Sequence, residues 1–182
     1  MRVQLRDLSS FRPTGYDKGR GVVAQALWFA TMNLLFSAWY CPRRLRPWLL
    51  RRFGASVGDN VFIRHKVRVL WPWKLTIGND SWIGEGVWLL NLEPIEIGAD
   101  VCLSQEAFLC TGSHDHRSST FGYRNAPIVV ADGAWVGARA MVLPGRSVGR
   151  CAVVAGGETL RVDLPDLTML VGGAIIEVPE PT

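Results

Sequence analysis

Residues 130–160 read VADGAWVGARAMVLPGRSVGRCAVVAGGETL, and an aliphatic residue returns at every sixth position of this stretch. Upstream, the same step of six appears in three blocks that begin at Val57, Ile77 and Ile97, with a step of eight between blocks. This period is neither the 2 of a strand nor the 3.6 of a helix. Three units of six make a triangular coil of about eighteen residues, and stacked coils bury one continuous apolar column. The sequence therefore predicts a mainly β fold, a parallel β-solenoid.

Glycine and small residues recur within each unit. Glycine follows the aliphatic residue at Gly58, Gly78, Gly84, Gly98, Gly137 and Gly149, and a small or β-branched residue often stands four positions after it. We expect the small residue to fit inside a tight corner and glycine to supply backbone angles that other residues resist. The repeat predicts a solenoid over 56–163, preceded by a helical, basic, Trp-rich segment (1–55) and followed by a tail (164–182).

The repeat breaks once. Leu109 and Val130 are 21 residues apart, where six or eight are expected. The surplus predicts a loop ejected from the coils at about 113–127. Loops that leave a rigid scaffold carry function more often than the scaffold does.

Charge is uneven along the 182 residues, whose net charge is +4. No acidic residue lies between Asp17 and Asp59, whereas that segment contains seven Lys and Arg. Its uncharged stretch 21–42 is interrupted by polar residues, so we expect an amphipathic or packed helix, with a membrane span or a helix lying on the bilayer as alternatives. This segment suggests peripheral contact with the inner face of a membrane. No motif for nucleic-acid binding accompanies the basic residues, so no nucleic-acid partner is expected.

Four scattered cysteines form no CxxC pair, and no apolar leader begins the chain. Such usage argues against a disulfide framework or a zinc knuckle. The expected location is therefore cytoplasmic.

Longer stretches carry a family resemblance. WPWKLTIG, SWIGEGVWLLNL, CLSQEAFLCTGSHD and GAWVGARAMVLPG resemble the colanic acid biosynthesis acetyltransferases, which are hexapeptide-repeat relatives of the maltose and galactoside O-acetyltransferases. The resemblance implies a left-handed β-helix and a homotrimer with active sites between subunits. It also implies acetyl-CoA as co-substrate, a sugar or lipid-linked saccharide as acceptor, and no required metal.

The resemblance assigns the catalytic base to His114 in TGSHD, just before the ejected loop. A sugar hydroxyl is a poor nucleophile at neutral pH, and imidazole titrates close enough to that pH to remove its proton. Asn91, Glu93 and Asp115 are the expected acceptor-binding residues. Asn91 and Thr111 stand one turn apart, so they should stack near His114.

On the cofactor side, the resemblance assigns CoA binding to Trp135, Ala138 and Gly156. Trp135 has an alternative interpretation as part of a surface aromatic ladder with Trp82 and Trp88. The segment GGETLRVDLP departs from the usual AGSVVTKDVP of the family, and Arg161 is expected to supply the positive charge for the CoA phosphates.

Three alternatives remain open. Cys110 or Cys102 paired with histidine would form an acyl-enzyme, although free cysteines on apolar strands are usually small core residues. His65, His114 and His116 would bind zinc in a γ-carbonic-anhydrase-like enzyme. A solenoid without catalytic activity would act as a scaffold.

Overall fold

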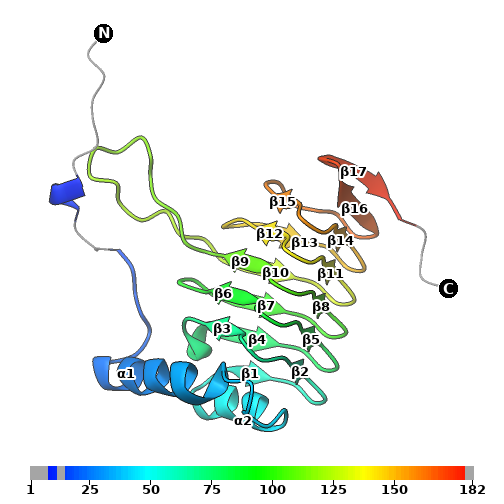
Figure 1. Ribbon diagram of the computed structural model, residues 1–182. Coiled ribbons are helices and arrows are strands. Elements are labelled where there is room, and N and C mark those ends of the chain that lie inside the picture. The colour runs from blue at the N-terminus through cyan, green and yellow to red at the C-terminus, as the bar shows by residue number, and fades with distance from the viewer. Residues whose placement is uncertain (1–7, 12–14, 179–182) are drawn as a thin grey trace.

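Residues 8–11 and 15–178 are described by the computed structural model, in which the chain winds into a triangular parallel solenoid with helices at one end (Figure 1). The predicted N-terminal segment and tail extend over residues 1–7, 12–14 and 179–182, which lie outside the described residues.

Three sheets form the faces of the prism. Sheet A is parallel and contains, in order, β1 (Ser56–Val57), β4 (Leu75–Ile77), β7 (Ile95–Ile97), β10 (Ile128–Val130) and β13 (Ser147–Val148). Sheet B contains β2 (Phe62–Ile63), β5 (Trp82–Ile83), β8 (Cys102–Leu103), β11 (Trp135–Val136), β14 (Val153–Val154), β16 (Thr168–Val171) and β17 (Ala174–Glu177). Sheet C is parallel and contains β3 (Arg68–Val69), β6 (Trp88–Leu90), β9 (Phe108–Cys110), β12 (Met141–Val142) and β15 (Thr159–Leu160).

The sixfold period sets the register between coils. On sheet A, Val57 pairs with Ile77, Ile77 with Ile97, and Ile97 with Val130. The predicted inward positions are all buried except Val57, which is half-buried at the first coil. The small corner residues are buried as well. The repeat therefore predicted both the fold and the residues of its core.

We expected glycine to supply backbone angles that other residues resist, and this physical reason is wrong. Gly137, like the other glycines that follow an aliphatic residue, is not in the left-handed region. A Cβ on Gly137 would instead lie 2.5 Å from the backbone nitrogen of Gly156 in the next coil. Left-handed angles fall later in the corner, for example at Lys66 (φ 59°) and Arg139 (φ 58°). Glycine is required here because backbones of successive coils approach closely.

The solenoid continues past its predicted boundary at residue 163. Leu164 forms a bridge with Val148, and β16 pairs in parallel with β14. The chain then reverses, and β17 pairs antiparallel with β16. Glu158, whose corner position breaks the small-residue pattern, accepts a hydrogen bond from the backbone N–H of Gly173 at the hairpin turn. The segment 164–178 therefore closes the solenoid instead of forming a tail.

The helices are α1 (Val22–Thr31), a π-helical turn (Met32–Phe36), α2 (Leu45–Arg52), and two short 3₁₀ turns, η1 (Leu8–Ser10) and η3 (Pro72–Lys74). We refer to residues 22–52 as the helical cap. In the part of the chain that the structure describes, no helix has the length and apolarity needed to cross a membrane.

The helical cap satisfies the open edge of the first coil. Trp28 Nε1 donates to the Val69 carbonyl at 2.9 Å, and Arg51 Nε donates to the Val57 carbonyl at 2.8 Å. Arg46 lies between them, 4% exposed, and donates to the Ile63 carbonyl as well as to two carbonyls of the cap itself. Burial lowers the pKa of the Arg46 guanidinium. Each strand of the first coil thus receives a side-chain donor in place of a neighbouring strand.

Candidate active site

The ejected loop leaves the corner between sheets C and A as a short two-stranded ladder (Figure 1). His114 forms an antiparallel bridge with Tyr123, and the backbone N–H of Asp115 donates to Gly122 O at 2.8 Å. The Ser113 N–H donates to the Asn125 side-chain oxygen at 3.0 Å. Because the loop bonds to itself, its base holds His114 in a defined place beside the coils.

Phe121 orients the His114 ring. Nδ1 of His114 lies 2.7 Å from the Phe121 carbonyl oxygen, and the two rings stack at 4.3 Å with planes 4° apart. A carbonyl oxygen only accepts hydrogen bonds, so this contact requires the proton on Nδ1. In the neutral ring, Nε2 is then the nitrogen with a free lone pair. Phe121 has φ 51°, which is a sparsely populated conformation for an aromatic residue. Residues with strained backbone angles of this kind are concentrated at functional sites.

The described part of the N-terminal arm, residues 8–11 and 15–20, packs against the same loop. Phe11 contacts both His114 and Tyr123 edge-on, with ring centroids 5.6 and 5.4 Å apart. Tyr16 contacts Tyr123 at 5.5 Å and accepts a hydrogen bond from the Trp71 indole. Segments about one hundred residues apart in sequence therefore surround His114 with aromatic rings, which sequence analysis did not foresee.

A cavity of about 460 Å³ opens beside His114. Its lining also includes Ser113, His116, Arg124, Asn125, Ala126, Leu143, Pro144, Gly145, Arg146 and Arg161. Three of these side chains are arginines, so the cavity favours an anionic ligand. Arg146, which breaks the small-residue pattern of the corners, also pairs with Asp163 at 3.6 Å. The position of Arg146 on the cavity wall explains why a large charged residue replaces a small one at this corner.

Asn125 was not singled out from sequence. Its side-chain oxygen accepts from Ser113, but its amide nitrogen is buried and has no hydrogen-bond partner among the described residues. A buried donor without a partner costs free energy, and such groups often await a ligand. The sequence feature that could have identified Asn125 is the NAP stretch of the ejected loop, because polar residues at the base of a loop are frequent ligand contacts.

The prediction that Asn91 binds the acceptor is wrong. Asn91 is fully buried. Its side-chain oxygen accepts a hydrogen bond from the Trp71 N–H, and its side-chain nitrogen donates to the carbonyls of Trp71 and Lys74. It stacks over Thr111 as expected, one turn apart, but both residues are fully buried and serve the corner that carries two extra residues per turn. Asn91 is therefore a structural residue.

Glu93 and Asp115 lie near the site without lining the cavity. The Glu93 carboxylate is 4.0 Å from Lys74 Nζ, and its backbone N–H donates to Thr111 Oγ1 at 3.0 Å. The Asp115 carboxylate accepts from the Arg117 N–H at 2.9 Å and so caps a turn of the loop. The structure gives each carboxylate a local partner, and an acceptor-binding role for them stays a prediction.

The four residues predicted for CoA divide into two groups. Ala138 and Gly156 stack in adjacent coils, where the Ala138 carbonyl accepts from the Gly157 N–H at 2.8 Å. Trp135 lies at the same corner, half exposed, with its indole N–H on Ser104 Oγ. Arg161 instead lines the His114 cavity at the other end of the sheet C strands. The aromatic ladder divides too, because Trp82 and Trp135 belong to sheet B whereas Trp88 stacks on Phe108 in sheet C.

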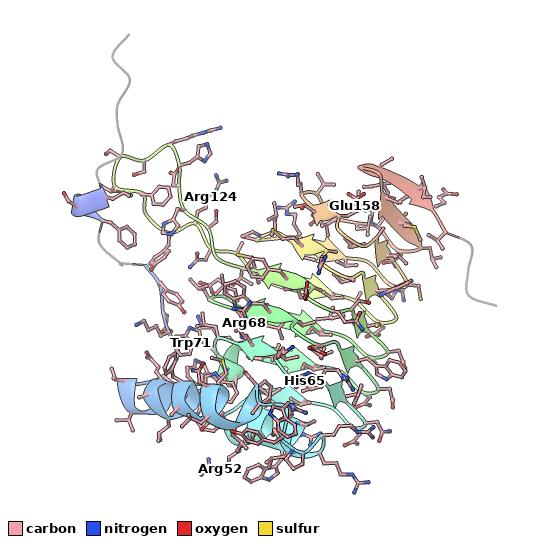
Figure 2. The ribbon with its side chains drawn as sticks, in the orientation of Figure 1. Arg52, His65, Arg68, Trp71, Arg124 and Glu158 are labelled. Carbon is pink, nitrogen blue, oxygen red and sulfur yellow. The ribbon has the colours of Figure 1, made fainter. Side chains whose placement is uncertain are left out.

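The cysteine and metal alternatives gain no support. Burial raises the pKa of the Cys110 thiol, whose Sγ–H donates to the Gly112 carbonyl, so the nucleophilic thiolate is disfavoured. His65 lies 3.3 Å from Glu85 on the first coils, well away from the loop that carries Arg124 (Figure 2). Within residues 8–11 and 15–178, no group of three His, Cys, Asp or Glu side chains is placed to hold a metal ion.

Comparison with solved structures places the fold among hexapeptide-repeat acetyltransferases. A maltose O-acetyltransferase from Clostridium difficile superposes with a TM-score of 0.78 at 22% identity, over 87% of this chain and 88% of that one. The acetyl-CoA complex of the Vibrio cholerae acetyltransferase VCA0836 gives 0.79 at 19% identity, over 94% and 95%. The solenoid is therefore the left-handed parallel β-helix of that class. No protein-family model matches the chain.

Sequence comparison narrows the class. The putative colanic acid biosynthesis acetyltransferase WcaF of Escherichia coli K12 is 39% identical over 180 residues, which cover 97% of each chain. The galactoside O-acetyltransferase of the same organism is 22% identical over 130 residues, 70% of this chain and 64% of that one. The fold and the relatives define a hexapeptide-repeat acetyltransferase. The chain belongs to the colanic acid biosynthesis acetyltransferase family.

Proposed function

We propose that the protein transfers the acetyl group of acetyl-CoA to a hydroxyl of a sugar, with His114 as general base. Nε2 of His114 removes the hydroxyl proton while the sugar oxygen attacks the thioester carbonyl. The C–S bond then breaks, and the proton passes from the imidazolium to the CoA thiolate. This is direct transfer, without an acyl-enzyme.

One observation carries the proposal: the Nδ1 contact with the Phe121 carbonyl at 2.7 Å. It fixes the tautomer in which Nε2 is unprotonated, and the ring lines a cavity large enough for a sugar. The buried, unpartnered amide of Asn125 on the same wall is available to bond the acceptor or the developing oxyanion.

We propose further that the active site forms between subunits of a homotrimer. The predicted pantetheine contacts Trp135, Ala138 and Gly156 lie at one corner of the prism, whereas His114 and Arg161 lie at another. Contact between the first corner of one chain and the second corner of its neighbour would bring thioester and base together. Arg161 would then lie on the thioester side of the site with Arg124 and Arg146, and its contact with the CoA phosphates stays a prediction. The acceptor class we propose is a sugar or lipid-linked saccharide of a surface polysaccharide, handled in the cytoplasm at the inner face of a membrane.

The test compares His114 with a histidine that lies outside the candidate site. Acetyl transfer from acetyl-CoA is measured against free glycosides, nucleotide sugars and lipid-linked saccharides. His114→Ala should lower kcat/KM by about a hundredfold to ten-thousandfold, the range of general-base catalysis. His65→Ala is the control, because His65 lies on the first coils and away from the ejected loop, and it should keep most activity. Unchanged transfer by the His114 variant would exclude the mechanism.

A further inference from the structure

The helical stretch made of α1 and the π-helical turn is apolar on its outer face as well as on its inner face. Inward, Trp28 and Phe36 are buried against the first coil. Outward, Val22 and Val23 are 78% and 75% exposed, and Leu34 is 71% exposed. The stretch 21–42 contains no charged residue. A helix that is hydrophobic on all sides is normally covered on all sides, by protein or by lipid.

Large aromatic side chains extend this exposed apolar surface along the helical cap. Trp39 is 81% exposed, and Tyr40 and Trp48 are each more than half exposed. We define the basal surface as the exposed apolar residues of the helical cap, namely Val22, Val23, Leu27, Phe29, Leu34, Trp39, Tyr40 and Trp48. Tryptophan and tyrosine are enriched where membranes meet water, because their rings are apolar and one end bonds to polar groups.

Arginines border the basal surface. Arg43, Arg44 and Arg52 are exposed, and Arg52 projects from the helical end of the molecule (Figure 2). Arg43, Arg44 and Arg51 line a cavity of about 340 Å³ at the start of α2, together with Asp59, which lies 3.9 Å from Arg51. Asp59 offsets the charge of Arg51, whereas residues 18–58 contain no acidic residue to offset Arg43, Arg44 and Arg52. The surface therefore combines apolar area with unbalanced positive charge.

This combination favours a lipid surface over a second copy of the chain. Two copies joined through the basal surface would bring the same arginines towards one another, and like charges across an interface cost several kcal/mol. An anionic bilayer instead offers phosphates to the arginines and acyl chains to the valines and leucines.

We propose that the helical cap docks on anionic phospholipid bilayers, with the basal surface inserted among the lipids and Arg43, Arg44 and Arg52 on lipid phosphates. The proposal specifies the surface behind the membrane location proposed above, and it does not depend on the chemistry at His114. Docking would hold the end of the solenoid at the bilayer and direct the coils away from it.

The test is co-sedimentation of the full chain with phosphatidylcholine vesicles that contain either no phosphatidylglycerol or one third of it. We expect binding to the anionic vesicles that weakens with salt. Leu27→Gln combined with Leu34→Gln should reduce this binding by about tenfold or more, because two exposed leucines lose their insertion energy. Arg43→Gln combined with Arg44→Gln should reduce it by roughly tenfold on anionic vesicles only.

Ile175→Gln combined with Ile176→Gln is the matched control. These two isoleucines are similarly aliphatic and exposed, but they lie on β17 at the opposite end of the solenoid. The control should bind like the wild type, as should His114→Ala, whose loss of acetyl transfer would leave docking intact. Equal binding to neutral and anionic vesicles would overturn the proposal. So would a Leu27 and Leu34 variant that binds normally but has a changed oligomeric mass, which would assign the surface to subunit contacts.

Discussion

The coils and the ejected loop position their side chains by different means. In the coils, a residue such as Leu103 is fixed twice, by strand pairing with β5 and β11 and by complete burial in the column. In the loop, the His114 ring depends on one carbonyl, one ring stack, the edge of Phe11 and the tilted ring of Tyr123. The coils therefore provide a rigid frame, and the loop holds the proposed base by only a few contacts. Changes in the coils should appear first as lost stability, and changes in the loop as lost rate.

The largest effect is expected in the coils. Leu103→Ala should lower the free energy of unfolding by about 2–5 kcal/mol, because a fully buried leucine leaves a cavity between coils that cannot collapse. Denaturant unfolding followed by circular dichroism measures this change. Val129→Ala on the outward face of β10 is the control, and its expected loss is much smaller because Val129 is exposed. Similar losses for both variants would mean that the column is less tightly packed than the burial indicates.

In the loop, Asn125→Asp should lower kcat/KM by about tenfold or more, and it should also lower stability because a carboxylate oxygen replaces a buried nitrogen. Aspartate keeps the oxygen that accepts from Ser113, but it removes the buried amide donor, which has no partner among the described residues. The loss of one hydrogen bond to a bound ligand is worth about 1–3 kcal/mol. Steady-state kinetics together with a melting curve separate the two effects. A variant with normal kinetics would remove Asn125 from the site.

The smallest effect is expected at the junction between coil and loop. Cys110→Ala should leave acetyl transfer within about twofold of the wild type, since burial raises the pKa of this thiol and disfavours its reactive form. Mass spectrometry under turnover should detect no acetylated Cys110. A large loss of rate with an acetylated wild-type cysteine would replace direct transfer by an acyl-enzyme mechanism.

Periodicity explains which parts of the molecule were predictable. The coils repeat one local solution, so residues such as Ile83 and Val136 reveal their burial by spacing alone. The loop has no repeat, and the packing of Phe11 on His114 joins segments that share no local signal. The family resemblance assigned His114, but it gave Asn91 an acceptor role that burial contradicts. A buried structural asparagine and a ligand-binding asparagine look the same in the sequence, and only their hydrogen-bond partners in the structure distinguish them.

The side-chain donors of the helical cap also limit how the molecule assembles. A parallel β-solenoid has no intrinsic end, because each coil is a template for another, and an open edge invites other chains to extend it into a fibre. Trp28, Arg46 and Arg51 occupy the carbonyls of Val69, Ile63 and Val57, the positions that another coil would use. At the far end, β17 runs antiparallel and interrupts the winding. The helical cap therefore blocks growth at the first coil, and loss of Arg46 should expose an edge prone to fibrillar aggregation.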